Sequence, residues 1–178
     1  MFRNFYPWEY SKSVFDIDYK KLYRQGYRGI IFDVDNTLVH HGDDSTPEVD
    51  QLFRTLHEIG FKTFLLTDNN EERVKRFIRN IDTQYLCEAG KPDPSCYRKA
   101  LEALNMDRSQ VVCIGDQIFL DILGANRAGI ASILVHFIRL PSETKIGKRR
   151  QLEKVILWFY RHNRSAQHRL GNIHKEKV

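Results

Sequence analysis

The chain has 178 residues, of which 42% are hydrophobic and 29% charged, which is typical of a globular protein of one domain. It has no run of about 18 apolar residues, which argues against a membrane-spanning helix. The N-terminus shows no signal-peptide pattern, and the three cysteines show no CxxC spacing. We therefore expect a cytoplasmic protein with free thiols.

The net charge of +5 is unevenly distributed along the chain. Residues 145–178 contain ten Lys/Arg and two Asp/Glu, a net of +8, which leaves −3 for residues 1–144. Such a basic segment indicates either a solvated surface or an anionic partner, such as nucleic acid or lipid headgroups.

Strand-like apolar runs alternate with amphipathic helical patterns. The predicted elements, in chain order, are a strand at 28–34, a helix at 47–59, a strand at 61–67, a helix at 70–80, a short strand at 83–87, a helix at 94–105, a strand at 111–116, a helix at 118–128 and a strand at 131–137. This alternation predicts an α/β fold with a mostly parallel sheet and helices on both faces.

We divide the chain into an N-terminal extension (1–27), a core (28–140) and a basic C-terminal helix and tail (141–178). The predicted C-terminal helix, 149–162, has an apolar face flanked by basic side chains. That face is formed by Leu152, Val155, Ile156 and Phe159. It is expected either to pack on the core or to lie on anionic lipid.

Three of the predicted strands end in polar side chains. Asp33 and Asp35 lie at the end of the first, Thr67 and Asp68 at the end of the second, and Asp116 at the end of a later one. Residues two apart on a strand point to the same side, and parallel strands gather ligands at their carboxyl ends. Because neighbouring carboxylates repel, we expect a divalent cation, Mg²⁺, to be held by Asp33, Asp35 and Asp116.

These residue types suit phosphoryl transfer. An aspartate such as Asp33 can attack a phosphate and form an acyl-phosphate, and a second carboxyl such as Asp35 can act as acid and base. Thr67 offers a hydroxyl group, and Lys91, in the loop AGKPDP, offers a compact positive charge. Both are therefore candidates to bind the phosphate.

Four segments resemble, in order, the four motifs of the haloacid dehalogenase (HAD) superfamily. They are DVDNT (33–37), LLTDNN (65–70), GKPDP (90–94) and GDQIFLD (115–121). The resemblance implies a Rossmann-like HAD core.

The same resemblance implies a role for each motif residue. Asp33 would be the nucleophile, and Asp35 the acid/base, with its backbone carbonyl on the metal. Thr67 and Lys91 would bind phosphate. Asp116 would be a metal ligand, and Asp121 would act on the metal indirectly or through water.

A finer resemblance is to the subfamily IIIA phosphatases, which include phosphatidylglycerophosphate phosphatases and YqeG-like bacterial relatives. It rests on FDVDNTLV, on GDQ with the following LGANRAG, and on the upstream FDIDYKKLYRQGYRGI. It implies a phospholipid substrate.

The spacing of the motifs leaves no room for a cap domain. Asp33 and Thr67 are 34 residues apart, and Thr67 and Lys91 are 24 apart. We therefore expect a Mg²⁺-dependent phosphomonoesterase with an open site and a large or membrane-surface substrate such as phosphatidylglycerophosphate. Peripheral contact with the inner face of the membrane would follow.

Two alternatives remain open at this point. The enzyme could act on phosphoproteins or nucleic-acid ends, or the chain could be a binding or assembly module that contacts RNA through its basic tail. The sequence does not define an oligomeric state.

Overall fold

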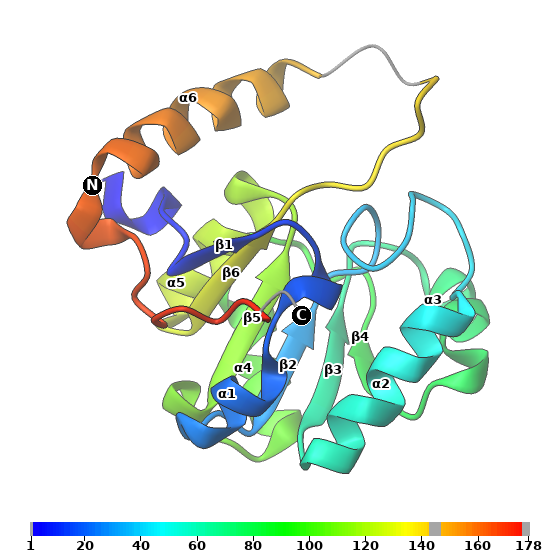
Figure 1. Ribbon diagram of the computed structural model, residues 1–178. Helices are drawn as coiled ribbons and strands as arrows, with labels where there is room; N and C mark the ends of the chain where they lie inside the picture. The colour runs from blue at the N-terminus through cyan, green and yellow to red at the C-terminus, as the bar shows by residue number, and fades with distance from the viewer. Residues whose placement is uncertain (1, 143–146, 176–178) are drawn as a thin grey trace.

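The computed structural model describes residues 2–142 and 147–175, which contain a six-stranded, all-parallel sheet (Figure 1). Its strands are β1 (Glu9–Ser11), β2 (Gly29–Phe32), β3 (Lys62–Leu66), β4 (Gln84–Leu86), β5 (Val111–Gly115) and β6 (Ala131–Val135). They lie in the order β1-β6-β5-β2-β3-β4. The central pair, β2 and β5, are direct neighbours, so the segments after these two strands leave the sheet side by side.

Helices cover both faces of the sheet, as the sequence predicted. They are α1 (Tyr19–Arg24), α2 (Pro47–Ile59), α3 (Glu71–Phe77), α4 (Pro94–Leu104), α5 (Leu123–Ala128) and α6 (Lys148–His162). Because side chains alternate along β2, Phe32 packs on Phe53 of α2, whereas Ile31 joins the cluster around Tyr97 of α4. The described residues contain no separate cap domain, since only a loop, α2 and β3 separate Asp33 from Thr67.

The predicted elements are present, with shifts at their ends. Helix α2 has the predicted bounds, because Thr46 caps its first turn and Gly60, at φ 109°, ends it. The predicted helix at 70–80 is α-helical only to Phe77 and ends in a 3₁₀ turn. The predicted helix at 118–128 begins with a π-helical turn, Ile118–Ile122, before α5.

Both ends of the described chain belong to the same core. Residues 1–27, expected as an extension, supply the edge strand β1 and the helix α1, whose Leu22 is fully buried. The segment after α6 returns to this region, where Ile173 is buried and its carbonyl accepts a 2.6 Å hydrogen bond from the Asp18 N–H. Leu170 joins the same cluster.

Helix α6 turns most of its expected apolar face away from the body of the protein. Leu152, Val155 and Phe159 are about half exposed, at 53%, 49% and 53%. Ile156 and Leu157 instead pack on a small cluster near β6. No helix in the described ranges has the length and hydrophobicity needed to cross a bilayer.

Candidate active site

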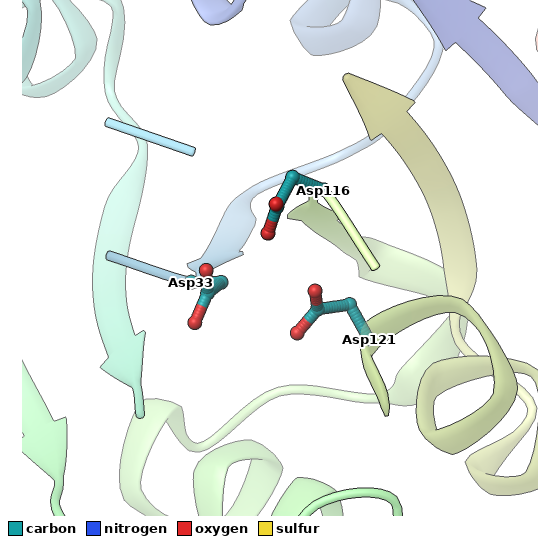
Figure 2. Close-up of side chains that lie close together, drawn as sticks. All are labelled: Asp33, Asp116 and Asp121. Carbon is teal, nitrogen blue, oxygen red and sulfur yellow. The ribbon is translucent and has the colours of Figure 1, made fainter. Parts of the chain in front are cut away.

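Three buried carboxylates lie together at the carboxyl ends of β2 and β5. Asp33 follows β2 directly, Asp116 follows β5, and Asp121 lies on the π-helical turn that comes next. Figure 2 shows the three side chains pointing toward one another. One oxygen of each carboxylate lies within 4.8 Å of the oxygens of the other two. Because β2 and β5 are neighbours and parallel, they bring Asp33 and Asp116 to one edge of the sheet.

The position of Asp121 depends on Gly115 and on the π-helical turn. A Cβ atom on Gly115 would lie 2.4 Å from Cγ of Asp121, so only glycine leaves room for this carboxylate. The Gln117 N–H donates to Oδ2 of Asp121 at 3.0 Å, and the Tyr97 hydroxyl donates to the Asp121 carbonyl at 3.2 Å. A π-helical turn at a functional site is a recurrent feature of helices.

Lys91 lies between two of the carboxylates. Its Nζ is 2.6 Å from Oδ1 of Asp33 and 2.8 Å from Oδ1 of Asp121, and all three side chains are buried. The loop is held by Asp68, whose Oδ1 accepts hydrogen bonds from the N–H groups of Gly90 and Lys91. Burial acts to lower the pKa of Lys91, but the Asp121 and Asp33 carboxylates outweigh it, so the pKa rises and Lys91 stays cationic.

The hydroxyl of Thr37 connects Asp33 and Asp116. Thr37 Oγ1 is 2.9 Å from Oδ2 of Asp33 and 3.2 Å from Oδ1 of Asp116. A hydroxyl has one hydrogen to donate, so both contacts are satisfied when one carboxyl is protonated and donates to Thr37. Sequence reasoning assigned Thr37 no role, although its position within the DVDNT segment could have indicated one.

Burial raises the pKa of two carboxyls of this cluster, Asp33 and Asp116. Burial raises the pKa of Asp33 to about 6, against the opposing charge of Lys91. Burial and the neighbouring Asp33 and Asp121 raise the pKa of Asp116 to about 8, against the opposing charge of Arg150. Buried carboxyls this close together favour either protons or a bound cation.

Helix α6 contributes two residues that the sequence did not predict. Arg150 forms an ion pair with the Asp116 carboxylate, and its Nη1 donates to the Asp116 carbonyl at 2.5 Å. Glu153 is buried, accepts from Nη1 of Arg150 at 3.0 Å and accepts from the Ile118 N–H at 2.8 Å. Both residues are distant from the four motifs, so no sequence pattern pointed to them.

Asp35 lies apart from the three-carboxylate cluster and has its own partners. Its side chain accepts from the Asn69 amide at 2.9 Å and from the Gly42 N–H at 3.2 Å, and it contacts His41 at 3.0 Å and Arg73 at 3.3 Å. These partners hold the Asp35 side chain, and Asp35 is not one of the three carboxylates whose oxygens lie within 4.8 Å of one another.

Burial acts to raise the pKa of Asp35, but the hydrogen bonds and positive charges around it outweigh burial and lower it. The pKa of Asp35 is thus shifted in the direction opposite to the pKa values of Asp33 and Asp116.

Thr67 is buried at the end of β3 and is linked to Asp35 through Asn69. The backbone N–H and the side-chain amide of Asn69 donate to Thr67 Oγ1 at 3.2 and 2.9 Å, and the same amide nitrogen reaches Asp35. Among the described residues, Thr67 forms no hydrogen bond with Asp33, Asp116 or Asp121. The sequence missed Asn69, although it lies within the LLTDNN segment.

The donor set suits a divalent metal ion. Asp33, Asp116 and Asp121 each offer a carboxylate oxygen, the kind of ligand that hard cations take. The raised pKa values of Asp33 and Asp116 show that negative charge is disfavoured at this place, and a bound cation would relieve the repulsion between these groups.

A parallel α/β sheet with buried aspartates and a lysine at its carboxyl edge defines a phosphatase-type hydrolase. The chain belongs to the haloacid dehalogenase-like hydrolases, whose family model matches residues 40–129, half of the chain. The family expected from the motifs is thereby confirmed, and the chain is a HAD-type phosphatase.

Particular relatives support this assignment. The chain is 34% identical over 174 residues to "Probable phosphatase YqeG" of Bacillus subtilis (strain 168), covering 97% of each chain. It is 25% identical over 167 residues to "Phosphatidylglycerophosphate phosphatase 1, chloroplastic/mitochondrial" of Arabidopsis thaliana, covering 86% of this chain and 48% of that protein.

A crystal structure of an uncharacterized protein from Listeria monocytogenes serotype 4b supports the fold alone. It matches with a TM-score of 0.53 and 18% identity, over 76% of this chain and 99% of the other.

Proposed function

We propose that this protein is a Mg²⁺-dependent phosphomonoester hydrolase that works through an aspartyl-phosphate on Asp33. The observation that carries this proposal is the buried cluster in which Asp33 lies 2.6 Å from the Lys91 ammonium and close to Asp116 and Asp121. A nucleophilic carboxylate beside a fixed positive charge is what phosphoryl transfer to an aspartate requires.

The metal set would consist of Asp33, Asp116 and the backbone carbonyl of Asp35, with Asp121 beside it. When bound, Mg²⁺ would neutralise charge on the phosphoryl group. Lys91 would hold the phosphoryl oxygens together with Thr67, whose Oγ1 accepts bonds from Asn69 and keeps its own hydrogen to donate. These donors would fix the phosphate in line with Asp33.

The reaction would proceed in two displacements. In the first, a carboxylate oxygen of Asp33 forms a bond to phosphorus, the ester P–O bond breaks, and the leaving alkoxide takes a proton from Asp35. In the second, water attacks phosphorus, the Asp33 O–P bond breaks, and Asp35 takes the water's proton.

The environment of Asp35 fits both proton transfers. Its lowered pKa gives the carboxylate that accepts the water's proton. The negative charge of an arriving phosphate would raise this pKa, since like charges disfavour ionisation, and would supply the protonated form needed in the first step.

The proposed substrate is large or presented at a membrane surface, such as phosphatidylglycerophosphate. Three observations support this choice: the described chain has no cap domain, one relative is named a phosphatidylglycerophosphate phosphatase, and the C-terminal segment is strongly basic. An uncovered site admits a bulky leaving group that a lid would exclude.

Phosphate release with Mg²⁺ tests the proposal on two substrates in parallel, phosphatidylglycerophosphate in mixed micelles and a soluble aryl phosphate. We expect preference for the lipid and no turnover by Asp33→Asn, whose amide cannot act as the nucleophile. Asp35→Asn should slow turnover by a factor on the order of 10²–10⁴, the usual contribution of an acid/base group.

Activity retained in Asp33→Asn would refute the mechanism. Turnover of the aryl phosphate alone would reject the lipid substrate. Phosphopeptides and nucleic-acid ends would then be the substrates to assay.

A further inference from the structure

Helix α6 carries a contiguous exposed apolar surface, which we call the outer face of α6. It is formed by Leu152, Val155, Trp158 and Phe159, exposed at 53%, 49%, 56% and 53%. Six large apolar side chains are exposed in the described ranges, and four of them form this face. Figure 1 shows α6 at the margin of the molecule, on the β1 side of the sheet.

The opposite side of α6 already attaches the helix to the protein. Glu153 and Tyr160 are buried there, and Ile156 and Leu157 pack on a cluster with Ile118. Glu153 also accepts from the Ile118 N–H at 2.8 Å. The outer face is therefore not needed to hold α6 in place, so its apolar character calls for another explanation.

The charge around the outer face is of one sign. Within residues 147–175 the only acidic residue is Glu153, which is buried and paired with Arg150. The basic side chains exposed along α6 are Lys148, Arg149, Lys154 and Arg161. A helix with an apolar face and a cationic border is the pattern of helices that lie in the interface of anionic bilayers.

We propose that the outer face of α6 inserts into the interface of an anionic lipid bilayer, with the bordering lysines and arginines on the headgroup phosphates. A nucleic-acid backbone would pair with the positive charges but would leave Leu152, Val155 and Phe159 in water. A second copy of the chain would bring two cationic helices against each other, and like charges across an interface are unfavourable.

The position of α6 connects this surface to the active site. A cavity of about 360 Å³ lies between α6 and the end of β6, and its lining runs from Asp116 and Arg150 to Trp158 and Arg161. A protein docked through α6 would bring this cavity, which Asp116 lines, close to the headgroup layer. This connection rests on the proposed function, whereas docking itself does not require catalysis.

Flotation of the full-length protein with vesicles tests the docking. We would compare phosphatidylcholine vesicles containing phosphatidylglycerol with vesicles of phosphatidylcholine alone, for wild type and for Asp33→Asn. The catalytically disabled variant separates vesicle binding from turnover, so failure of the docking and failure of the proposed function are distinguishable.

Matched variants locate the binding surface. Leu152→Gln with Phe159→Gln removes apolar area from the outer face, and Arg149→Gln with Lys154→Gln removes charge from its border. Phe15→Gln is the control, because Phe15 is exposed at 38% beside α1 and α2 rather than on α6. Point variants are preferred to truncation because Leu170 and Ile173, after α6, belong to the core.

We expect wild type, Asp33→Asn and Phe15→Gln to bind the anionic vesicles. The Leu152/Phe159 variant should lose at least about tenfold in partitioning, because the inserted apolar area is removed. The charge variant should bind the anionic vesicles more weakly, and added salt should weaken vesicle binding by the wild type.

Two results would overturn the proposal: the absence of vesicle binding, and vesicle binding that the Leu152/Phe159 variant retains in full. If vesicle binding is absent, self-association that the Leu152/Phe159 variant abolishes would identify a second copy of the chain as the partner. RNA binding that the charge variant abolishes would identify RNA instead.

Discussion

Replacing Lys91 with Met should destabilise the metal-free protein in a pH-dependent manner. Lys91 places one positive charge 2.6 Å from Asp33 and 2.8 Å from Asp121, with all three side chains buried. Met keeps much of the volume of the side chain but removes its charge. Removing one partner of a buried ion pair costs about 3–5 kcal/mol, so we expect a loss of this size at about pH 8.

The loss should shrink as the pH falls toward 5. The pKa of Asp33 is already raised to about 6 in the folded protein, and loss of Lys91 would raise it further. A carboxyl whose folded pKa exceeds its unfolded value of 3.8 binds protons that the unfolded state does not, so folding stability increases as pH falls through the folded pKa. Once Asp33 is protonated, loss of the Lys91 charge should cost less stability.

Urea unfolding in the presence of EDTA, followed by circular dichroism, measures this effect at both pH values. Lys75→Met is the matched control, because Lys75 is exposed and pairs with exposed Glu71. We expect that control to leave the stability nearly unchanged. A loss below about 1 kcal/mol for Lys91→Met, or an equal loss at both pH values, would refute the reasoning.

Three further predictions concern the same site. Gly115→Ala should displace Asp121, whose Cγ lies 2.4 Å from the new Cβ position, and should weaken Mg²⁺ binding by about tenfold or more in calorimetry; unchanged affinity would contradict this. Glu153→Ala should lower the free energy of unfolding by about 1–3 kcal/mol in urea, because the Ile118 N–H loses its acceptor, whereas Glu153→Gln should lose less. Equal losses in the two variants would show that this hydrogen bond is unimportant. Finally, Mg²⁺ affinity should rise with pH up to about 8, because the cation must displace the proton on Asp116; titrations that show no pH dependence would count against the raised pKa.

The sequence predicted the fold because the strands of a parallel sheet are short apolar runs that stand out between amphipathic helices. Strand β1 escaped prediction because its three residues, EYS, carry no apolar run, and its pairing with β6 arises only in the folded chain. Tertiary packing also determined which side of α6 faces outward. Periodicity identified that face, but it could not indicate that Glu153 and Tyr160 would be the residues turned inward.

For the site, strand ends and motif order predicted that Asp33 and Asp116 would meet, since both lie at carboxyl ends of parallel strands. The partners of the Asp35 side chain were not predictable, because Asn69 and Arg73 come from a later loop and from α3, and the spacing of Asp33 and Asp35 does not indicate them. Nor could spacing predict Arg150, which reaches Asp116 across 34 residues of sequence from another element.

The return of the chain after α6 has a consequence for folding during synthesis. Hydrogen bonds join Asp18 to Ile173 and Trp8 to Arg169, so early and late segments of the chain lie against each other. Until residues 169–173 have left the ribosome, the apolar cluster around Leu22 lacks part of its cover. A nascent chain would therefore expose an aggregation-prone apolar surface near its N-terminus. A chaperone that shields this surface would act before residues 169–173 have been synthesised and packed against it.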